Sequence, residues 1–250
     1  MRGTVSLVGA GPGDPELLTV RAARRLAEAE VLFHDALVSP QILALARSSH
    51  RVDVGKRAGG VGTSQEEINR LLVRAASRGR RVVRLKCGDP FVLGRGGEEA
   101  LALAEAGIAF EVVPGVSSAL AAPALAGIPV THRGIASGFA VLSGHAEQAW
   151  MPILDGIAPG SMTLVVLMGL AARARITAAL LARGWATNTP AAVLLGASMP
   201  DARAWFGELR GLGGVAIPEG AAPGTICIGS VVGLAQVIGA SPAARAVALP

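Results

Sequence analysis

The chain has 250 residues, of which 51% are hydrophobic, 16% charged and 3% aromatic. This length and apolar content suit one or two domains with sizeable cores and exclude a disordered, highly charged tail protein. The net charge is +5, tyrosine is absent, and the lysines are Lys56 and Lys86 alone, so most of the basic charge is arginine that stays protonated, and no tyrosine is available to stack on the bases of single-stranded nucleic acid.

In the first half of the chain, short apolar runs alternate with helical patterns. We predict strands at residues 5–8, 31–33, 52–54, 81–85 and 110–113, and helices at residues 17–29 and 96–106. Between them, the capping-box pattern of Ser64 and Glu67 predicts the start of a helix, and Gly79 predicts its end. A run of β–α units favours a largely parallel sheet with helices on both faces.

The second half repeats this style with fewer charges. We predict strands at residues 140–142, 163–167, 191–195 and 225–228, and a helix at residues 176–182. Residues 114–118 are the predicted hinge, because proline and glycine there break both periodicities. The chain is therefore expected to form two α/β domains, residues 1–114 and 115–240, followed by a partly disordered tail at residues 241–250.

Several classes of protein are disfavoured by particular residues. Cys87 and Cys227 are too few for a disulfide scaffold and lack paired metal spacing, which favours a reducing cytoplasm and no metal. The first residues read as a strand and loop rather than a signal peptide. The uncharged run 112–132 is interrupted by prolines and glycines, so we expect no membrane span. Nucleic acid is not expected as a partner, although an arginine excess suits either nucleic acid or a small polyanion.

The glycine-rich run 9–14 follows a predicted strand and precedes a predicted helix. A dinucleotide fingerprint would have its third glycine one residue later than Gly13, and Pro12 lacks the amide that a phosphate would use. A plain tight turn accounts for this run about equally well.

Asp35 and Lys56 each follow a predicted strand, where ligands of an open parallel sheet bind. Asp35 is either a proton acceptor or the N-cap of the next helix. Lys56 lies in a glycine-rich basic loop, which is either functional or simply solvated.

The run 82–99 combines a strand end, the Asp89–Pro90 turn, the glycine-flanked Arg95 and a helix start. A purely structural role does not easily explain so many special residues in one short segment. Cys87 has no histidine near it in sequence, so we interpret it as a packing residue rather than a nucleophile.

Taken in order, these motifs resemble the tetrapyrrole methylases. Residues 8–19 (VGAGPGDPELLT) look like the opening signature of that family, and residues 84–99 are similar to the signature of its branch that methylates uroporphyrinogen III. Further matches to that branch follow at residues 55–59, 65–69, 113–115, 126–129 and 131–133. Together they cover the chain to about residue 234, and such a set is highly specific.

The resemblance implies two α/β domains with S-adenosylmethionine folded into the cleft between them, and a homodimer. The implied reaction transfers two methyl groups in succession to C-2 and C-7 of uroporphyrinogen III. It gives precorrin-2, a precursor of sirohaem and cobalamin, and S-adenosylhomocysteine. Carried over by motif, the cofactor-binding residues are Pro12, Cys87, Gly88, Asp89, Ser117, Ser118, Met168, Ala197 and either Gly224 or Thr225.

The resemblance also assigns roles to charged residues. Asp35 matches the family's proposed proton acceptor, and Lys56 its proposed proton donor. We expect Arg57, Arg95 and Arg133 to bind the substrate's carboxylates, since guanidinium groups suit them. The chain departs from the family pattern where tyrosine, glycine, phenylalanine and tyrosine are usual, at His34, Cys87, Leu93 and Leu125.

Three alternatives remain open from the sequence. The first is another branch of the same family that methylates a later precorrin, against which residues 91–99 speak. The second is a nicotinamide-dependent oxidoreductase, disfavoured by Pro12 and the early third glycine. The third is an arginine-rich nucleic-acid binder, which the lack of a basic run beyond residues 78–86 disfavours.

Overall fold

The computed structural model describes residues 2–47, 49–55, 62–239 and 247–248. The chain divides into two compact units, Met1–Ser117 and Ser118–Pro250. This division lies inside residues 114–118, the predicted hinge. Apart from residues 247–248, the tail 241–250 lies outside the described residues, so its disorder stays a prediction.

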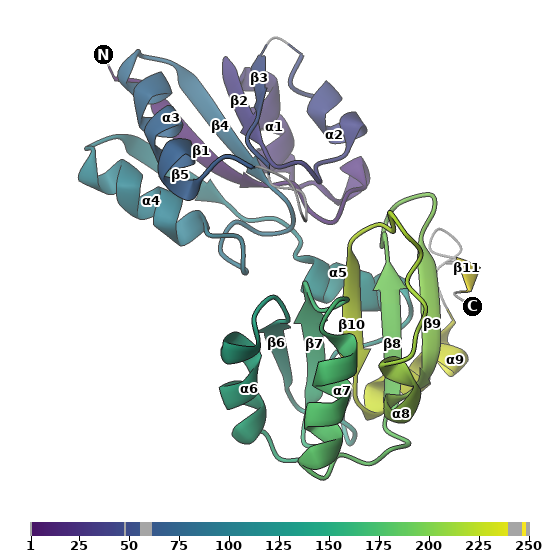
Figure 1. Ribbon diagram of the computed structural model, residues 1–250. Coiled ribbons are helices and arrows are strands. Elements are labelled where there is room, and N and C mark those ends of the chain that lie inside the picture. Colours follow the sequence, from purple (N-terminus) through teal and green to yellow (C-terminus); the bar gives the residue numbers. More distant parts are fainter. Residues whose placement is uncertain (1, 48, 56–61, 240–246, 249–250) are drawn as a thin grey trace. The chain divides into compact units, whose positions relative to one another are not determined.

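The first unit is built on a parallel sheet (Figure 1). Its five strands lie in the order β3-β2-β4-β1-β5, and every neighbouring pair is parallel. The sequence-based prediction of a parallel sheet is therefore confirmed here. The strand bounds are β1 Thr4–Gly9, β2 Val31–His34, β3 His50–Asp53, β4 Arg81–Lys86 and β5 Ala109–Val113.

Helices cover both faces of this sheet because its strands are apolar on both sides. Leu26 of α1 (Val20–Glu28) and Ile42 of α2 (Pro40–Ala44) pack on one face with Val8, Leu32 and Val83. On the other face, α3 (Gln65–Ser77) and α4 (Gly96–Glu105) pack on the alternate strand residues Val5, Leu7, Phe33 and Val82.

Capping residues set the helix bounds. The predicted helix 17–29 is divided: Asp14 caps a short 3-10 helix, η1 (Pro15–Leu17), and the Thr19 hydroxyl then accepts a hydrogen bond of 3.1 Å from the amide of Ala22 to begin α1. Ser64 caps α3 as predicted, accepting from the amide of Glu67 at 3.2 Å. Gly79, with φ of +80°, follows the end of that helix.

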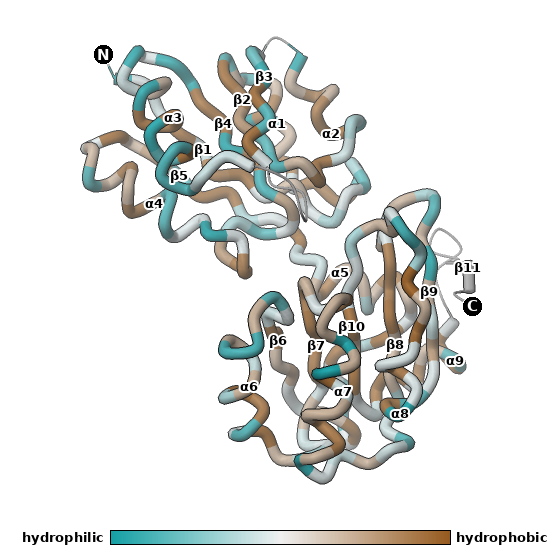
Figure 2. Tube along the Cα trace, viewed as in Figure 1, coloured by the Kyte–Doolittle hydropathy of each residue, from teal (hydrophilic) through white to brown (hydrophobic). Residues whose placement is uncertain are grey.

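The second unit has a mixed sheet with the order β11-β9-β8-β10-β7-β6, in which β10 is antiparallel to both of its neighbours. Figure 2 shows β7 and β8 as largely apolar. The predicted strands correspond to β6 Phe139–Ser143, β7 Thr163–Leu167, β8 Pro190–Leu195 and β10 Gly224–Ile228, whereas β9 Arg203–Glu208 and β11 Val247–Ala248 were not predicted.

Helices also pack on both faces of the second sheet. On one face, a hydrophobic core joins the strands to α6 (Glu147–Asp155), α7 (Arg173–Ala182) and α8 (Leu209–Leu212). On the opposite face, a second core joins the strands to α5 (Ser118–Leu125), η2 (Ser230–Leu234) and α9 (Ala235–Ile238). The predicted helix 176–182 is the C-terminal part of α7.

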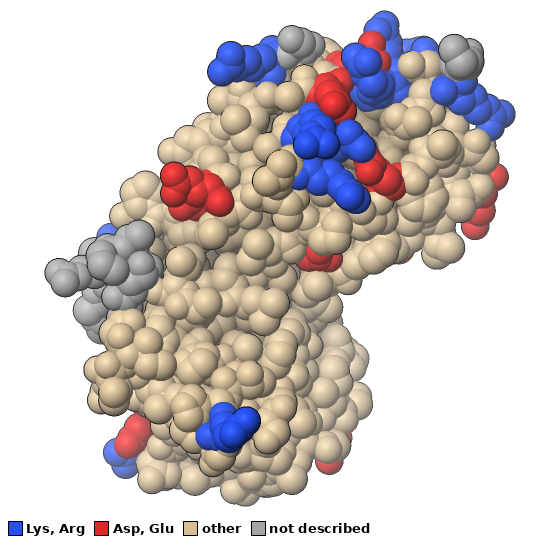
Figure 3. All heavy atoms as spheres, turned by 180° about the vertical axis from the view of Figure 1, so that it is seen from behind, with Lys and Arg blue, Asp and Glu red and all other residues tan. Residues whose placement is uncertain are grey.

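Charge is unevenly distributed along the chain. Residues 112–132, 134–146 and 156–172 contain no lysine, arginine, aspartate or glutamate. On the face shown in Figure 3 the charged side chains accordingly gather on the first unit, and little charge is visible on the second. Within the described ranges, no helix is long and apolar enough to cross a membrane.

Replacing Leu26 with alanine should lower the free energy of unfolding by about 2–5 kcal/mol, because this fully buried side chain would leave a cavity beneath α1. The matched control is Val20→Ala in the same helix, where the side chain is 78% exposed and the change should stay within about 0.5 kcal/mol. Urea unfolding measures both. Equal losses would contradict the assignment of the buried face of α1.

Candidate functional site

The candidate site begins where β1 and β4 end. These strands are neighbours, but the chain leaves β1 toward α1 on one face of the sheet and leaves β4 toward α4 on the other. In open parallel sheets, ligands bind outside the carboxyl ends of two such strands, where the connections diverge. Pro12 and residues 87–89, predicted to bind the cofactor, lie in these two loops.

Glycine backbones bring the loops into direct contact. Gly11 and Gly88 exchange two hydrogen bonds, of 3.1 and 2.9 Å, and both have positive φ. A Cβ added to Gly115, which follows β5, would lie 2.2 Å from the carbonyl oxygen of Gly88 and 2.7 Å from the Cα of Gly9. Side chains are therefore excluded from the place where these three segments meet.

Asp89 fixes the loop after β4. Its carboxylate accepts hydrogen bonds from the amides of Phe91, at 2.8 Å, and Gly115, at 3.0 Å. The first bond makes the turn predicted at Asp89–Pro90, and the second ties this loop to the segment after β5. Within this unit, the Asp89 side chain thus holds backbone in place.

Asp35 stands at the same edge, just after β2. The alternative prediction, that Asp35 is the N-cap of the next helix, is wrong, because Ser39 caps α2. The Asp35 carboxylate instead accepts a hydrogen bond from Nη2 of Arg84 and a longer one, of 3.4 Å, from the amide of Cys87. Its side chain remains 28% exposed, so it combines a buried cation partner with access to solvent.

Cys87 is suited to packing. Burial raises the pKa of its thiol from 9.0 to about 12, and the nearby carboxylate of Asp35 adds to the rise. The thiol therefore stays protonated near neutral pH, where a nucleophilic cysteine would need to be a thiolate. Its side chain packs against the core that contains Leu26 and Ile42.

Sequence reasoning missed the ionic contacts beneath this edge. Glu99 of α4 is fully buried, and its Oε1 accepts hydrogen bonds from Nε of Arg84 at 3.0 Å, Nζ of Lys86 at 3.0 Å and Nε2 of Gln65 at 3.2 Å. A signal was present in the sequence: two basic residues at alternate positions of a strand with helices on both sides need buried acidic partners.

These contacts shift the pKa values of the two cations in opposite directions. Burial lowers the pKa of Lys86, and the neighbouring Arg84 lowers it further. Burial also acts to lower the pKa of Arg84, but the carboxylates of Asp35 and Glu99 outweigh it and leave that pKa raised.

The predicted proton donor and the predicted substrate-binding residues are not all within the described part of the chain. Lys56, the predicted proton donor, and Arg57, a predicted substrate-binding residue, lie outside it. Arg95 is half exposed and forms two hydrogen bonds of 2.7 Å with Glu98. Arg133 is exposed in a turn closed by a bridge between His132 and Ala136.

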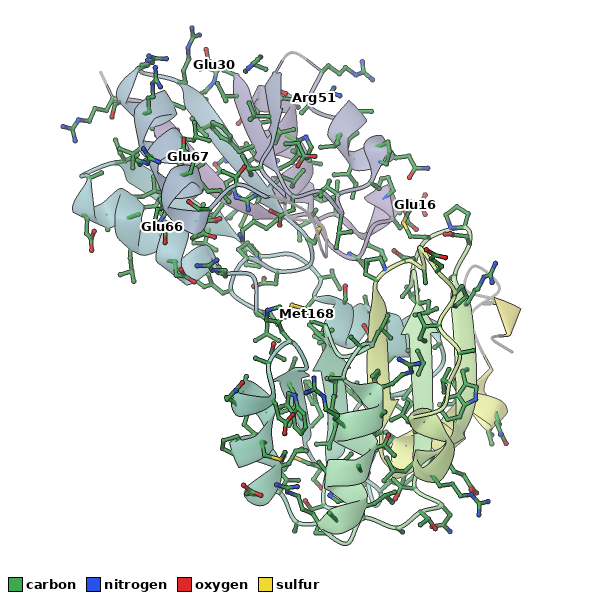
Figure 4. All side chains as sticks on the ribbon, in the orientation of Figure 1. Glu16, Glu30, Arg51, Glu66, Glu67 and Met168 are labelled. Carbon is green, nitrogen blue, oxygen red and sulfur yellow. The ribbon has the colours of Figure 1, made fainter. Side chains whose placement is uncertain are left out.

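In the second unit, the structure brings Met168, Ala197, Gly224 and Thr225 to one edge of the sheet. β7 and β8 end there and the antiparallel β10 begins there, with Thr225 paired to Leu167. Met168 follows the end of β7 (Figure 4) and is half exposed. Ala197 lines a small pocket with residues of α5, the helix that begins at Ser118; Ser117, a buried residue, belongs to the first unit.

Backbone strain lies in the same loops. Four non-glycine residues of the described chain have positive φ, and all follow a strand end: Leu93 and Arg95 after β4, Met168 after β7 and Ser198 after β8. Such conformations cost about 1–3 kcal/mol each and cluster at functional sites. This supports the loops after β4, β7 and β8 as candidate ligand contacts. Across the described residues, no group of three or more histidine, cysteine or acidic side chains is placed to hold a metal ion.

Gly115→Ala should lower the free energy of unfolding by about 1–3 kcal/mol, because the new Cβ would clash with the carbonyl of Gly88. Gly97→Ala in α4 is the control: its Cβ would meet nothing within 4 Å, and alanine should favour the helix by about 0.5–1 kcal/mol. Denaturant unfolding compares the two. If Gly115→Ala proved as stable as Gly97→Ala, the close approach of the loops would be disproved.

Comparison with known proteins gives consistent results. Siroheme synthase 1 of Yersinia enterocolitica is 46% identical over 235 residues, which are 93% of this chain and 50% of that protein. Siroheme synthase of Pseudomonas paraeruginosa is 47% identical over 236 residues, with the same coverage. The chain thus spans about half the length of these curated relatives.

A solved structure matches over its whole length. It is the uroporphyrin-III C-methyl transferase of Thermus thermophilus complexed with S-adenyl homocysteine, 44% identical, with a TM-score of 0.80, covering 93% of this chain and 100% of that one. A family model described as Tetrapyrrole (Corrin/Porphyrin) Methylases matches residues 4–213. With this match and the fold in agreement, the chain belongs to the tetrapyrrole methylases.

Proposed function

We propose that this protein transfers two methyl groups from S-adenosylmethionine to C-2 and C-7 of uroporphyrinogen III and so forms precorrin-2. The observation that carries the proposal is the match over the whole length of the Thermus uroporphyrin-III C-methyl transferase, whose structure was solved with S-adenyl homocysteine. The curated relatives are siroheme synthases, of which this chain spans half, so the proposal is limited to methyl transfer on the route to sirohaem or cobalamin.

The residues present fit S-adenosylmethionine. Gly11 and Gly88 leave bare backbone at the point where β1 and β4 diverge, which lets a ligand approach closely. The small pocket beside Ala197 is lined mainly by alanine and leucine, together with Ser198 and Arg203, so its apolar part suits an uncharged part of the cofactor. Bound there, the cofactor supplies an activated methyl group on a sulfonium. The proposed contacts are Pro12, Cys87, Gly88, Asp89, Ser117, Ser118, Met168, Ala197 and Gly224 or Thr225.

The protein's own residues position the reactants and move protons. When a substituted pyrrole carbon takes the methyl group it has no proton of its own to lose, so the ring system becomes cationic and releases a proton from another position; the partly exposed carboxylate of Asp35 is the proposed acceptor. Lys56 is the proposed proton donor. Arg57, Arg95 and Arg133 are proposed to bind the carboxylates of the substrate. A homodimer in the cytoplasm is part of the same proposal.

The product decides the function. Uroporphyrinogen III incubated without oxygen with the protein and methyl-labelled S-adenosylmethionine should gain two labelled methyl groups by mass spectrometry, and NMR of the product should place them on C-2 and C-7. A single addition, made to a later precorrin but not to uroporphyrinogen III, would instead indicate another branch of the family. Preference for a nicotinamide nucleotide over S-adenosylmethionine in a binding titration would contradict both.

Asp35→Asn and Lys56→Ala should each slow turnover by about 10²–10⁴-fold, the usual size of a lost general acid or base. The dissociation constant for S-adenosylmethionine should change by less than about threefold, because neither residue is assigned to the cofactor. Single-turnover rates and calorimetry separate the two effects. Glu105→Gln, at an exposed position of α4, is the charge-matched control for Asp35→Asn, and Arg74→Ala, at an exposed position of α3, is the control for Lys56→Ala. A near-normal rate in either variant would remove that residue from the mechanism.

A further inference from the structure

The buried charges beneath Asp35 form a connected group, which we call the Arg84 cluster: Arg84, Lys86, Glu99 and Gln65. Strand parity places Arg84 and Lys86 on the face covered by α3 and α4, and Phe33 pairs with Arg84 so that Asp35 follows on the same face. Exposure rises along the group, from 0% at Glu99 and 2% at Arg84 to 28% at Asp35. The cluster is therefore a buried ionic structure that ends at one solvent-accessible carboxylate.

Stability does not account for this cluster. Removing charges from water is costly, and replacing buried ion pairs by apolar residues is often neutral or stabilising. Glu99 shows this cost directly, because its Oε2 is buried and no described residue offers it a hydrogen bond. An apolar contact between β4 and α4 would avoid it, so the cluster calls for a role other than holding the helix in place.

The guanidinium of Arg84 is fixed on three sides. Its Nε donates to Glu99 at 3.0 Å, its Nη1 donates to the carbonyl of Leu85 at 3.1 Å, and its Nη2 donates to Oδ1 of Asp35. Glu99 is itself held by Lys86 and Gln65. A planar group held this way presents one donor in one direction, and that donor faces Asp35.

The two oxygens of Asp35 consequently differ. Oδ1 is occupied by the charged donor Nη2 of Arg84, whereas Oδ2 receives, from the described residues, only the long bond of 3.4 Å from the amide of Cys87. We propose that Arg84, anchored by Glu99, is a positioning residue that locks the Asp35 carboxylate so that Oδ2 is the oxygen that accepts the proton. This inference rests on the proposed function and deepens it.

Lys86 is the obvious rival for such a role, because lysine can exchange a proton. Its side chain is only 2% exposed, however, and its Nζ donates to Oε1 of Glu99 at 3.0 Å. Among the described residues no hydrogen bond or ion pair joins Lys86 to Asp35, whereas Arg84 contacts Asp35 directly, so Lys86 supports Glu99.

Arg84→Lys tests the inference while keeping a cation in the cluster. A single ammonium cannot bridge Glu99 and Asp35 as the guanidinium does, so we expect kcat to fall at least ~10-fold, and further in Arg84→Met, with KM for the tetrapyrrole and Kd for S-adenosylmethionine changed by less than about threefold. In the Asp35→Asn background, adding Arg84→Lys should slow turnover by less than about twofold, because residues that act as a unit are not additive.

The control is Ile108→Ala, which removes a buried side chain of the same unit directly before β5, at the opposite end of the strands from Asp35, and should leave kcat unchanged. Additive losses in the double variant, or a loss in Kd with kcat unchanged, would overturn the inference. Failure of the proposed function would look different: the unaltered protein would form no methylated product, or Asp35→Asn would turn over normally.

One measurement does not depend on activity. In a crystal structure of Arg84→Lys, Oδ2 of Asp35 should no longer lie near the amide of Cys87, and the carboxylate should occupy a second rotamer. An Asp35 side chain that kept the same rotamer and the same contact with Cys87 would show that Arg84 does not position it, whether or not the protein methylates tetrapyrroles.

Discussion

The site depends on three backbones that meet with no side chain between them. Parallel pairing brings the ends of β1, β4 and β5 to neighbouring positions, but strands stand ~4.8 Å apart and their loops normally turn away from one another. Here the loops approach within contact distance because glycine stands at positions 9, 88 and 115. Two hydrogen bonds between Gly11 and Gly88 join the loops after β1 and β4. The Asp89 carboxylate joins the loop after β4 to the segment after β5. A ligand bound at this edge would therefore contact backbone atoms that are held in place by other backbone segments.

The two faces of the sheet below that edge differ in character: one is apolar, and the other buries charged side chains. The α1 and α2 side of the sheet is filled by alanine, leucine, isoleucine and valine, while the α3 and α4 side buries charges at the carboxyl end of β4. The two sides therefore serve different ends. Apolar packing gives stability without directing any polar atom, whereas the Arg84 cluster directs one donor at Asp35 and gives up stability to do so. The second lysine, Lys86, belongs to this buried support rather than to the reacting groups.

Sequence patterns predicted those features of the fold that depend on residues close together in the sequence. The Ser64 cap, the glycine stop at Gly79 and the parallel strands of the first unit follow from neighbours in sequence and are present in the structure. β9 was missed because its sequence, RAWFGE, lacks a clean alternation, and its pairing is set by β8 instead. The role of Arg84 could not be predicted from its neighbours in sequence, because its partners, Asp35 and Glu99, lie on other elements. Only the direction of the Asp35 side chain, toward Arg84, distinguishes it from a helix N-cap. The candidate site residues could be predicted from the family resemblance, whereas the hydrogen bonds and ion pairs that connect them are tertiary contacts that only the structure shows.

The distribution of unfavourable features argues that these loops are functional rather than merely irregular. Each left-handed residue at Leu93, Arg95, Met168 or Ser198 costs about 1–3 kcal/mol, and the buried Oε2 of Glu99 adds a desolvation cost of similar size. A domain stable by only ~5–15 kcal/mol tolerates few such costs. Because all of these positions lie at or beneath strand ends where ligands of such sheets bind, selection for ligand geometry explains them better than selection for stability, which would have removed them.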